Sequence, residues 1–160
     1  MTGPAGVGKT FLIHQILEKL RQLCPKDKQI ISALRHCAAM LVGGKTLMHY
    51  LCKYKKKGGA PRPGSIVVID EISEVQLHML MEMAQWKMVG VRFILLGDFD
   101  GQLKPIFDRW QDAMTKKDIR ESQFLHEMCG GLHLRLTKYR RGEDVHCLLY
   151  TSPSPRDGLL

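Results

Sequence analysis

Apolar residues recur at helical spacing near the start of the chain and then give way to short, continuous apolar runs. The first pattern includes Phe11, Ile16 and Leu20 and predicts an amphipathic helix to about Leu23, which Pro25 ends. The continuous runs predict strands that are buried on both faces of a sheet, at residues 29–34, 65–69 and 91–96. Further helices are expected at residues 37–42, 46–54, 75–88 and 123–128, and a last strand at residues 132–136.

Helices and strands therefore alternate along the chain. This alternation predicts an α/β fold with a doubly wound, mainly parallel sheet that is flanked by helices. The length of 160 residues suits one domain, and 44% hydrophobic residues predict a packed core. Within the helix at residues 75–88, Met79, Met83 and Met88 are expected to fill that core. No apolar run reaches the roughly 18 residues of a membrane span, so no membrane partner is expected.

Charge and cysteine content narrow the partners and the compartment. The net charge of +8 favours a polyanionic partner, either nucleic acid or the phosphates of a nucleotide, although a solvated basic surface explains it equally well. The five cysteines are scattered and odd in number, so neither a zinc site nor a disulfide framework is indicated. An intracellular, reducing compartment is expected.

The octet near the start of the chain carries the clearest chemistry, because it fits G-x-x-x-x-G-K-[ST] in full. Its glycines let backbone N–H groups converge on phosphate oxygens, and the helix that follows adds its positive dipole end. Lys9 is expected to reach the β- and γ-phosphates of ATP, and the hydroxyl of Thr10 to ligate Mg²⁺. The predicted ATP-binding residues are Gly3, Pro4, Ala5, Gly6, Val7, Gly8, Lys9 and Thr10.

Two later strands end in residues suited to phosphate chemistry. The run at residues 65–69 ends in Asp70 and Glu71, at the edge where parallel sheets bind ligands. Asp70 is expected to hold Mg²⁺, often through water, and Glu71 to orient and deprotonate the attacking water. After the run at residues 91–96, Asp98 is expected to face the nucleotide and Gln102 to sense its γ-phosphate. An ordinary strand-end turn is the alternative for this last segment.

Five segments in this order resemble the superfamily 1B DNA helicases of the RecD-like, Pif type. The octet is similar to motif I of that family. Two departures from the family pattern occur: Arg35-His36 replaces the usual Thr-Gly of motif Ia, and Lys104 replaces the first proline of motif III. The other similar segments are Ser32-Ala33, Ala38-Ala39 and Gly43 to His49 for motif Ia, Ile69 to Ser73 for motif II, Gly97 to Pro105 for motif III and Leu136 to Arg141 for motif IV.

The resemblance implies the first RecA-like ATPase domain of a DNA helicase that moves on single-stranded DNA. Roles in replication, repair, recombination or telomere maintenance follow, in a DNA-containing compartment such as the nucleus or the mitochondrion. By the same resemblance, Arg141 is catalytic, with Arg140 as the alternative. Thr46 and His49 would contact single-stranded DNA, although Thr46 could equally cap a helix and His49 could pack in the core.

A basic run follows these candidate DNA contacts. Lys55 and Lys56 belong to it, and Tyr50 and Tyr54 are interleaved with its lysines. Basic groups with aromatic stacking partners suit single-stranded nucleic acid. A solvated loop is the equally weighted alternative.

The ends of the chain lead to two expectations about completeness. Residues 1–144 would form a partial RecA-like domain, and residues 145–160 a disordered or non-native tail. A buried strand usually precedes the phosphate loop, whereas only Met1 and Thr2 precede it here. The family's second RecA-like domain is expected as a missing partner from the same polypeptide. The alternatives are another P-loop NTPase, of AAA+ type, or a catalytically incomplete nucleic-acid-binding fragment.

Overall fold

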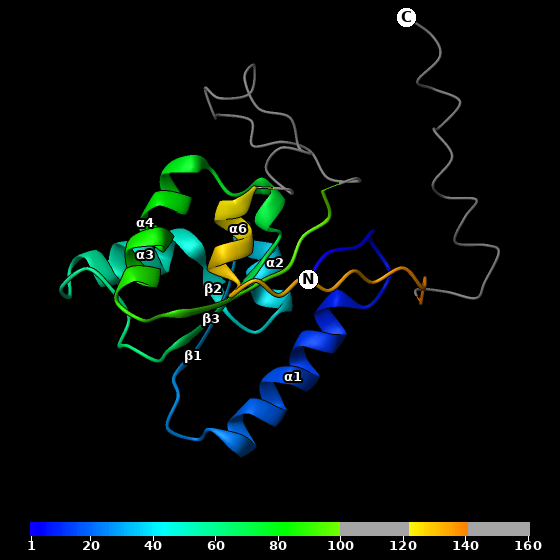
Figure 1. Cartoon of the computed structure of the whole chain (residues 1–160), viewed down its shortest axis with the longest axis horizontal. Helices are drawn as coiled ribbons and strands as arrows, with labels where there is room; N and C mark the ends of the chain where they lie inside the picture. Colours follow the sequence, from blue (N-terminus) through cyan, green and yellow to red (C-terminus); the bar gives the residue numbers. More distant parts are fainter. Residues whose placement is uncertain (100–121, 141–160) are drawn as a thin grey trace, which may run out of the picture.

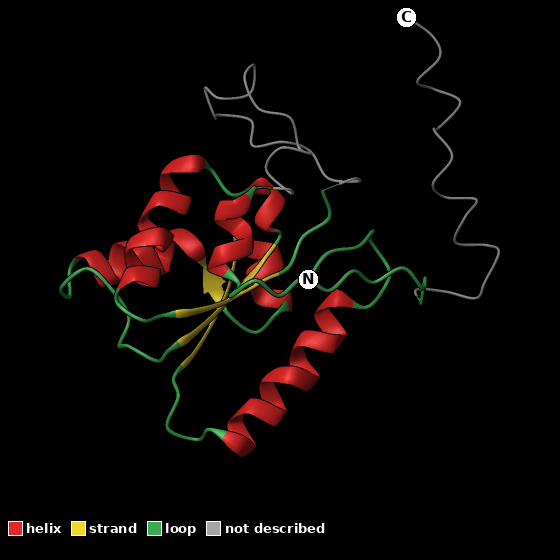
Figure 2. Ribbon diagram, in the orientation of Figure 1, coloured by secondary structure: helices red, strands yellow, loops and turns green. Residues whose placement is uncertain are grey.

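A parallel sheet with helices on both sides forms the body of the protein (Figures 1 and 2). The structure is a computed structural model, and it describes residues 1–99 and 122–140. The helices are α1 (Lys9–Leu23), α2 (His36–Leu41), α3 (Leu47–Lys55), the 3₁₀ turn η1 (Ile72–Glu74), α4 (Leu77–Met88) and α6 (Gln123–Met128). The strands are β1 (Gln29–Ala33), β2 (Lys45–Thr46), β3 (Ile66–Asp70) and β4 (Arg92–Leu95).

All strand pairs in this sheet are parallel, and the strand order is β2-β1-β3-β4. In this register Ala33 lies opposite both Thr46 and Asp70. The carboxyl ends of three neighbouring strands are therefore level with one another. The edge that they form carries the candidate site described below.

The central strand β3 explains why the sheet is covered on both faces. Successive side chains of a strand point to opposite faces. Ile66 and Val68 belong to one buried cluster together with Ile13 and Leu17 of α1. Val67 and Ile69, which alternate with them, belong to the second buried cluster, which also includes side chains of α3 and α4. The predicted doubly wound α/β architecture is confirmed.

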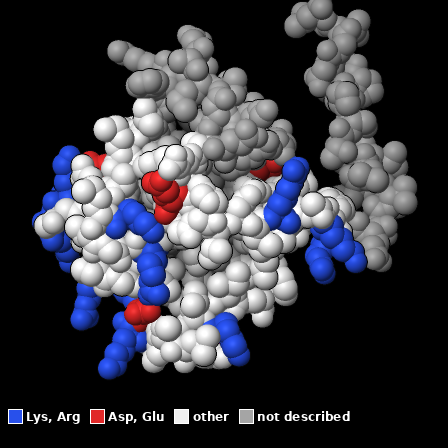
Figure 3. Space-filling view, viewed as in Figure 1, with Lys and Arg blue, Asp and Glu red and all other residues white. Residues whose placement is uncertain are grey.

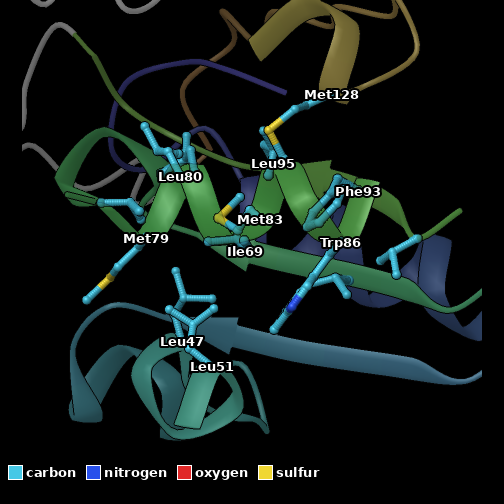
Figure 4. Packing of buried hydrophobic residues seen from close by; sticks show 14 of the residues in the cluster. Leu47, Leu51, Ile69, Met79, Leu80, Met83, Trp86, Phe93, Leu95 and Met128 are labelled. Carbon is cyan, nitrogen blue, oxygen red and sulfur yellow. The ribbon is translucent and has the colours of Figure 1, made fainter. Parts of the chain in front are cut away.

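The second cluster is the larger of the two, and Figure 4 shows side chains of the sheet, α3, α4 and α6 meeting in it. Trp86 is 1% exposed there, and its indole N–H donates to the Gly59 carbonyl oxygen over 2.8 Å. Tyr54 packs edge-on against the same indole, with ring centroids 5.5 Å apart. These contacts fix the loop after α3 against α4.

Most of the predicted elements are present, with ends that differ by one or two residues. The predicted strand at residues 132–136 is wrong, because Arg135 forms only an isolated parallel bridge to Thr2. Thr2 also bridges Gly97, and the N-terminal ammonium donates to the Leu95 carbonyl oxygen over 2.7 Å. Met1 to Gly3 therefore form backbone hydrogen bonds with the segment at the end of β4, as a short parallel strand beside it would, immediately before the turn of the phosphate loop.

Two expectations about buried apolar residues are corrected by the structure. Met79 and Met83 are buried as expected, but Met88 is 87% exposed because it is the last residue of α4. On α1 the buried face centres on Ile13 and Leu17, whereas Phe11 is 70% exposed. Among the described residues, no helix combines the length and apolar character needed to cross a membrane.

Candidate nucleotide-binding site

The phosphate loop joins Thr2 to α1 through glycines in left-handed backbone conformations. Gly6 has φ +84° and Gly8, the N-cap residue of α1, has φ +89°. Residues with a side chain adopt such angles only at a cost of about 1–2 kcal/mol. These glycines therefore allow a loop geometry that other residues would strain. The loop ends at the amino end of a helix of 15 residues, whose dipole favours an anion at this point.

The side chain of Lys9 folds back over the loop that precedes it. Its ammonium group donates to the carbonyl oxygens of Gly3, over 2.7 Å, and of Pro4, over 2.9 Å. Partial burial lowers the pKa of this ammonium group, whereas the negative charges of Asp98 and Asp70 act in the opposite direction. A cation thus lies inside the loop and within the electrostatic reach of acidic groups from two strands.

Thr10 and Asp70 bring the loop and the sheet together. The Thr10 hydroxyl donates to Asp70 Oδ2 over 3.4 Å, and Asp70 Oδ1 accepts the backbone N–H of Glu71 over 3.0 Å. A hydroxyl and a carboxylate are oxygen ligands of the kind that Mg²⁺ prefers. Within residues 1–99 and 122–140, no group of three or more His, Cys, Asp or Glu side chains could hold a metal ion. Because Mg²⁺ commonly relies on few protein ligands together with phosphate oxygens and water, this donor set fits it.

Glu71 has an unusual backbone conformation, with φ +60° and ψ +42°. The Glu74 N–H donates to the Glu71 carbonyl oxygen over 3.0 Å, and the Ile72 N–H donates to Leu96 O over 2.8 Å. Burial raises the pKa of the Glu71 carboxyl group, and the charges of Glu74 and Asp70 raise it further. Non-glycine residues in left-handed conformations cluster at active sites and ligand-binding sites, so this conformation supports a functional role for Glu71.

Asp98 is buried, at 4% exposure, and follows Gly97 at the end of β4. A Cβ atom at Gly97 would lie 2.8 Å from Ile72 Cγ2, so the turns after β3 and β4 pack closely together. The charge of Asp98 acts to raise the pKa of the Lys9 ammonium group, and the expectation that Asp98 faces the nucleotide stays a prediction. Gln102 and Arg141, both predicted as catalytic, lie outside the described residues.

The segment of residues 136–140 lies along the phosphate loop, which the sequence did not indicate. The Arg140 N–H donates to Gly6 O over 2.9 Å, and the Leu136 N–H donates to Thr2 O over 2.8 Å. A Cβ atom at Gly6 would lie only 2.4 Å from Tyr139 Cε2. Residues 136–140 therefore pack against the phosphate loop, and the backbone of Arg140 is hydrogen-bonded to it.

The two candidate DNA contacts at the start of α3 have different local roles. Thr46 caps α3, because its hydroxyl accepts the His49 N–H over 3.2 Å. The capping alternative for Thr46 is thus confirmed, and Thr46 lies level with Asp70 at the carboxyl edge of the sheet. The core alternative for His49 is wrong, because this side chain is exposed. Its ring contacts Tyr50 edge-on.

Lys55 and Lys56 lie at the other end of α3 and are exposed. Because α3 starts at the carboxyl edge and the following loop returns to the start of β3, these lysines are distant from Thr46 along the helix. Figure 3 shows Lys and Arg side chains along the side of the molecule where α3 lies. Tyr54 is 6% exposed, so the expectation that it stacks on bases is wrong.

A further ion pair adjoins the site, and its function was not predicted from the sequence. Arg35 follows β1, and Glu74 is the last residue of η1. The Arg35 guanidinium donates from Nε to Glu74 Oε2 over 2.8 Å and from Nη2 to Oε1 over 2.6 Å. Only the departure of Arg35 from the motif Ia pattern gave a signal in the sequence.

Comparisons with known proteins agree with this geometry. A family model described as an AAA domain matches residues 1–108. The ATP-dependent DNA helicase Pif1 of Bdellovibrio bacteriovorus is 32% identical over an alignment of 131 positions, and the match covers 66% of this chain and 29% of that protein. The ATP-dependent DNA helicase RRM3 of Saccharomyces cerevisiae is 26% identical, over 89% of this chain and 23% of its own length.

Solved structures show the same likeness. The crystal structure of Pif1 helicase from Candida albicans has a TM-score of 0.60 at 25% identity, and the match covers 85% of this chain and 34% of that one. Pif1 helicase from Bacteroides in complex with ADP-AlF3 and ssDNA has a TM-score of 0.53 at 24% identity, over 92% of this chain and 40% of that one. The latter likeness shows the fold alone.

The loop, its lysine and the acidic strand ends define a P-loop nucleotide-binding domain of RecA-like α/β fold. The chain belongs to the AAA domain family, and its similarities within that family are to the Pif1-type superfamily 1B helicases. The chain spans between 16% and 31% of the length of the four Pif1-type curated relatives that it matches.

Proposed function

We propose that this chain is the ATP-binding and ATP-hydrolysing part of a DNA helicase that acts on single-stranded DNA. The observation that carries the proposal is the convergence of the phosphate loop on the acidic end of β3, where Thr10 meets Asp70 over 3.4 Å. Four relatives that bear the name ATP-dependent DNA helicase support the same assignment. The DNA-containing compartments expected from the sequence, the nucleus or the mitochondrion, remain part of this proposal.

In this proposal each residue of the site has a separate task. The Lys9 ammonium exchanges its contacts with Gly3 O and Pro4 O for the β- and γ-phosphate oxygens of ATP. Thr10 and Asp70 would hold Mg²⁺, which neutralises phosphate charge when it is bound. Glu71 accepts a proton from the attacking water, and partial burial suits it to that task because a raised pKa makes it a better base.

The remaining partners are single-stranded DNA and a second RecA-like domain. Thr46 is the proposed strand contact nearest to the nucleotide, since it lies level with Asp70. Lys55 and Lys56 would contact a strand only farther along α3. An arginine that stabilises transition-state charge is a common need in such chemistry, and Arg141 and the second domain are its proposed sources.

Nucleotide binding by the purified chain tests the proposal most directly. A fluorescent ATP analogue is titrated with Mg²⁺ against the parent chain, Lys9→Ala and Lys19→Ala. The last variant is the matched control, because Lys19 is an exposed lysine on the same helix. Loss of at least about 1.4 kcal/mol of binding free energy, or tenfold in affinity, is expected for Lys9→Ala alone. Equal affinity of all three proteins would refute the phosphate site.

ATP hydrolysis with and without oligothymidylate then tests the helicase part. Hydrolysis that DNA stimulates in the parent and that Lys9→Ala abolishes agrees with a helicase motor. Hydrolysis indifferent to DNA points to another P-loop NTPase. DNA binding with no hydrolysis, when the assay is repeated on the longer polypeptide that includes the second domain, points to a nucleic-acid-binding protein without motor function.

A further inference from the structure

The Arg35–Glu74 ion pair connects the loop after β1 with the turn after β3. Its two hydrogen bonds, of 2.8 and 2.6 Å, form the parallel fork that guanidinium and carboxylate groups favour. The two partners differ in exposure, since the Glu74 side chain is 8% exposed and that of Arg35 is 61% exposed. Glu74 therefore belongs to the interior of the site edge, and Arg35 presents much of its side chain to solvent.

The inner end of the pair lies in the same turn as Glu71. The Glu74 N–H donates to the Glu71 carbonyl oxygen over 3.0 Å, so a shift of Glu74 acts on the backbone of Glu71 within one hydrogen bond. The pair is thus part of the support that holds the left-handed Glu71.

Arg35, the outer residue of the pair, lies at the edge of the sheet where Thr46 is proposed to contact single-stranded DNA. Arg35 is the N-cap residue of α2 and comes two residues after Ala33, which lies opposite Thr46. A guanidinium carries five N–H donors, and the fork to Glu74 uses Nε and one Nη2 hydrogen. The donors on the exposed side suit a phosphate oxygen, since arginine binds carboxylates and phosphates with the same planar fork.

We propose that Arg35 binds a backbone phosphate of single-stranded DNA while Glu74 positions it, so that the pair links the bound strand to the turn that carries Glu71. The inference rests on the proposed function and adds a binding residue and a positioning residue to it. When single-stranded DNA binds, its phosphate holds the exposed N–H donors of Arg35 in place. The bound Arg35 then restrains Glu74, and Glu74 restrains the backbone of Glu71. By reciprocity, nucleotide at the site strengthens strand binding by the same factor.

Anisotropy of a fluorescein-labelled oligothymidylate measures this link, with and without ADP-AlF3 and Mg²⁺ on the full 160-residue chain. In the parent we expect nucleotide to tighten strand binding by at least about fivefold. Arg35→Gln should reduce the salt dependence of log affinity by about 0.7, which is the loss of one phosphate contact on a single strand. In the same variant, nucleotide should no longer change the affinity for oligothymidylate, so that the ratio of the two affinities is about 1.

Two conservative variants separate charge from geometry. Arg35→Lys retains the positive charge, so the salt dependence of DNA affinity should stay unchanged. A lysine cannot make paired hydrogen bonds to Glu74 and to a phosphate at the same time, so nucleotide should no longer tighten DNA binding. Glu74→Gln leaves Arg35 charged and should abolish the nucleotide effect in the same way. Arg21→Gln is the control, because Arg21 is also an exposed arginine paired with a glutamate, on α1, and it should change neither quantity.

The outcomes separate the inference from the function on which it rests. A parent chain that binds no nucleotide, or no oligothymidylate, overturns the proposed function and the inference with it. A parent that binds both, with a nucleotide effect that survives in Arg35→Gln and Arg35→Lys, overturns the inference alone. If the salt dependence of DNA affinity is unchanged in Arg35→Gln, Arg35 does not contact a DNA phosphate and the inference is wrong. If Glu74→Gln fails to fold, the two variants of exposed Arg35 still decide the matter.

Discussion

Replacing Gly6 by alanine would test whether the segment of Tyr139 braces the phosphate loop. The variant changes the loop in two ways. A side chain at this position must adopt φ +84°, and its Cβ atom would lie 2.4 Å from Tyr139 Cε2. Because Tyr139 is 51% exposed, its ring can swing away from the loop, and the contact is then lost.

The two costs can be sized separately. The left-handed conformation of a residue with a Cβ costs about 1–2 kcal/mol. A fully enclosed tyrosine buries about 150–250 Å², so the half-buried Tyr139 covers about 100 Å², worth at most about 2.5 kcal/mol at about 25 cal/mol per Å². We therefore expect Gly6→Ala to lower the free energy of unfolding by about 1–4.5 kcal/mol, of which only the conformational cost of about 1–2 kcal/mol is independent of Tyr139.

Urea unfolding in two backgrounds measures the Tyr139 part. In the Tyr139→Ala background, Gly6→Ala should cost only about 1–2 kcal/mol. Gly43→Ala is the matched control, since Gly43 has φ +71° and nothing lies within 4 Å of its added Cβ. It should cost about 1–2 kcal/mol in both backgrounds. An identical cost of Gly6→Ala with and without Tyr139 would show that the ring does not brace the loop.

Three further changes test other parts of the structure. Glu71→Gln should abolish ATP hydrolysis, and it should raise the unfolding free energy because burial, and then the charges of Glu74 and Asp70, disfavour the carboxylate that the amide replaces; destabilisation in urea would contradict this. Leu17→Ala, at a site 1% exposed, should cost about 2–5 kcal/mol, and a loss below 1 kcal/mol in the same assay would contradict the packing of α1 on the sheet. Thr46→Ala should lower the melting temperature through the loss of about 1 kcal/mol of capping, whereas Thr46→Ser should not; equal melting of both variants would contradict the cap.

The sequence predicted the sheet and most helices because the periodicity of their residues directly reflects burial. β3 is a run of apolar side chains on both faces, and the structure buries Ile66 to Ile69 completely. The segment at residues 132–136 misled because its leucines follow a strand pattern, while Leu132 and Leu134 are 80% and 50% exposed. Strand pairing depends on distant partners, and here Thr2 provides only a single bridge.

At the site, sequence patterns predicted residues whose chemistry is local to a motif. Lys9, Thr10 and Asp70 are such residues, and the structure brings them together at the carboxyl edge. The contact of Tyr139 with the loop, and the pairing of Arg35 with Glu74, join residues that are 133 and 39 positions apart. Such contacts have no periodic signal, since they arise only when the sheet places separate loops side by side.

The parallel register is what makes these separate loops one site. Thr46, Ala33 and Asp70 are level with one another, so the proposed DNA contact at Thr46 and the proposed hydrolytic turn after β3 lie at the same edge of the sheet, with β1 between them. A slip of one residue would turn every side chain of a strand to the other face and separate them. Ser32 opposes such a slip, because its hydroxyl is fully buried and donates to the Val68 carbonyl oxygen over 3.1 Å. A polar group inside the sheet thus helps to hold the alignment on which a link between strand and nucleotide depends.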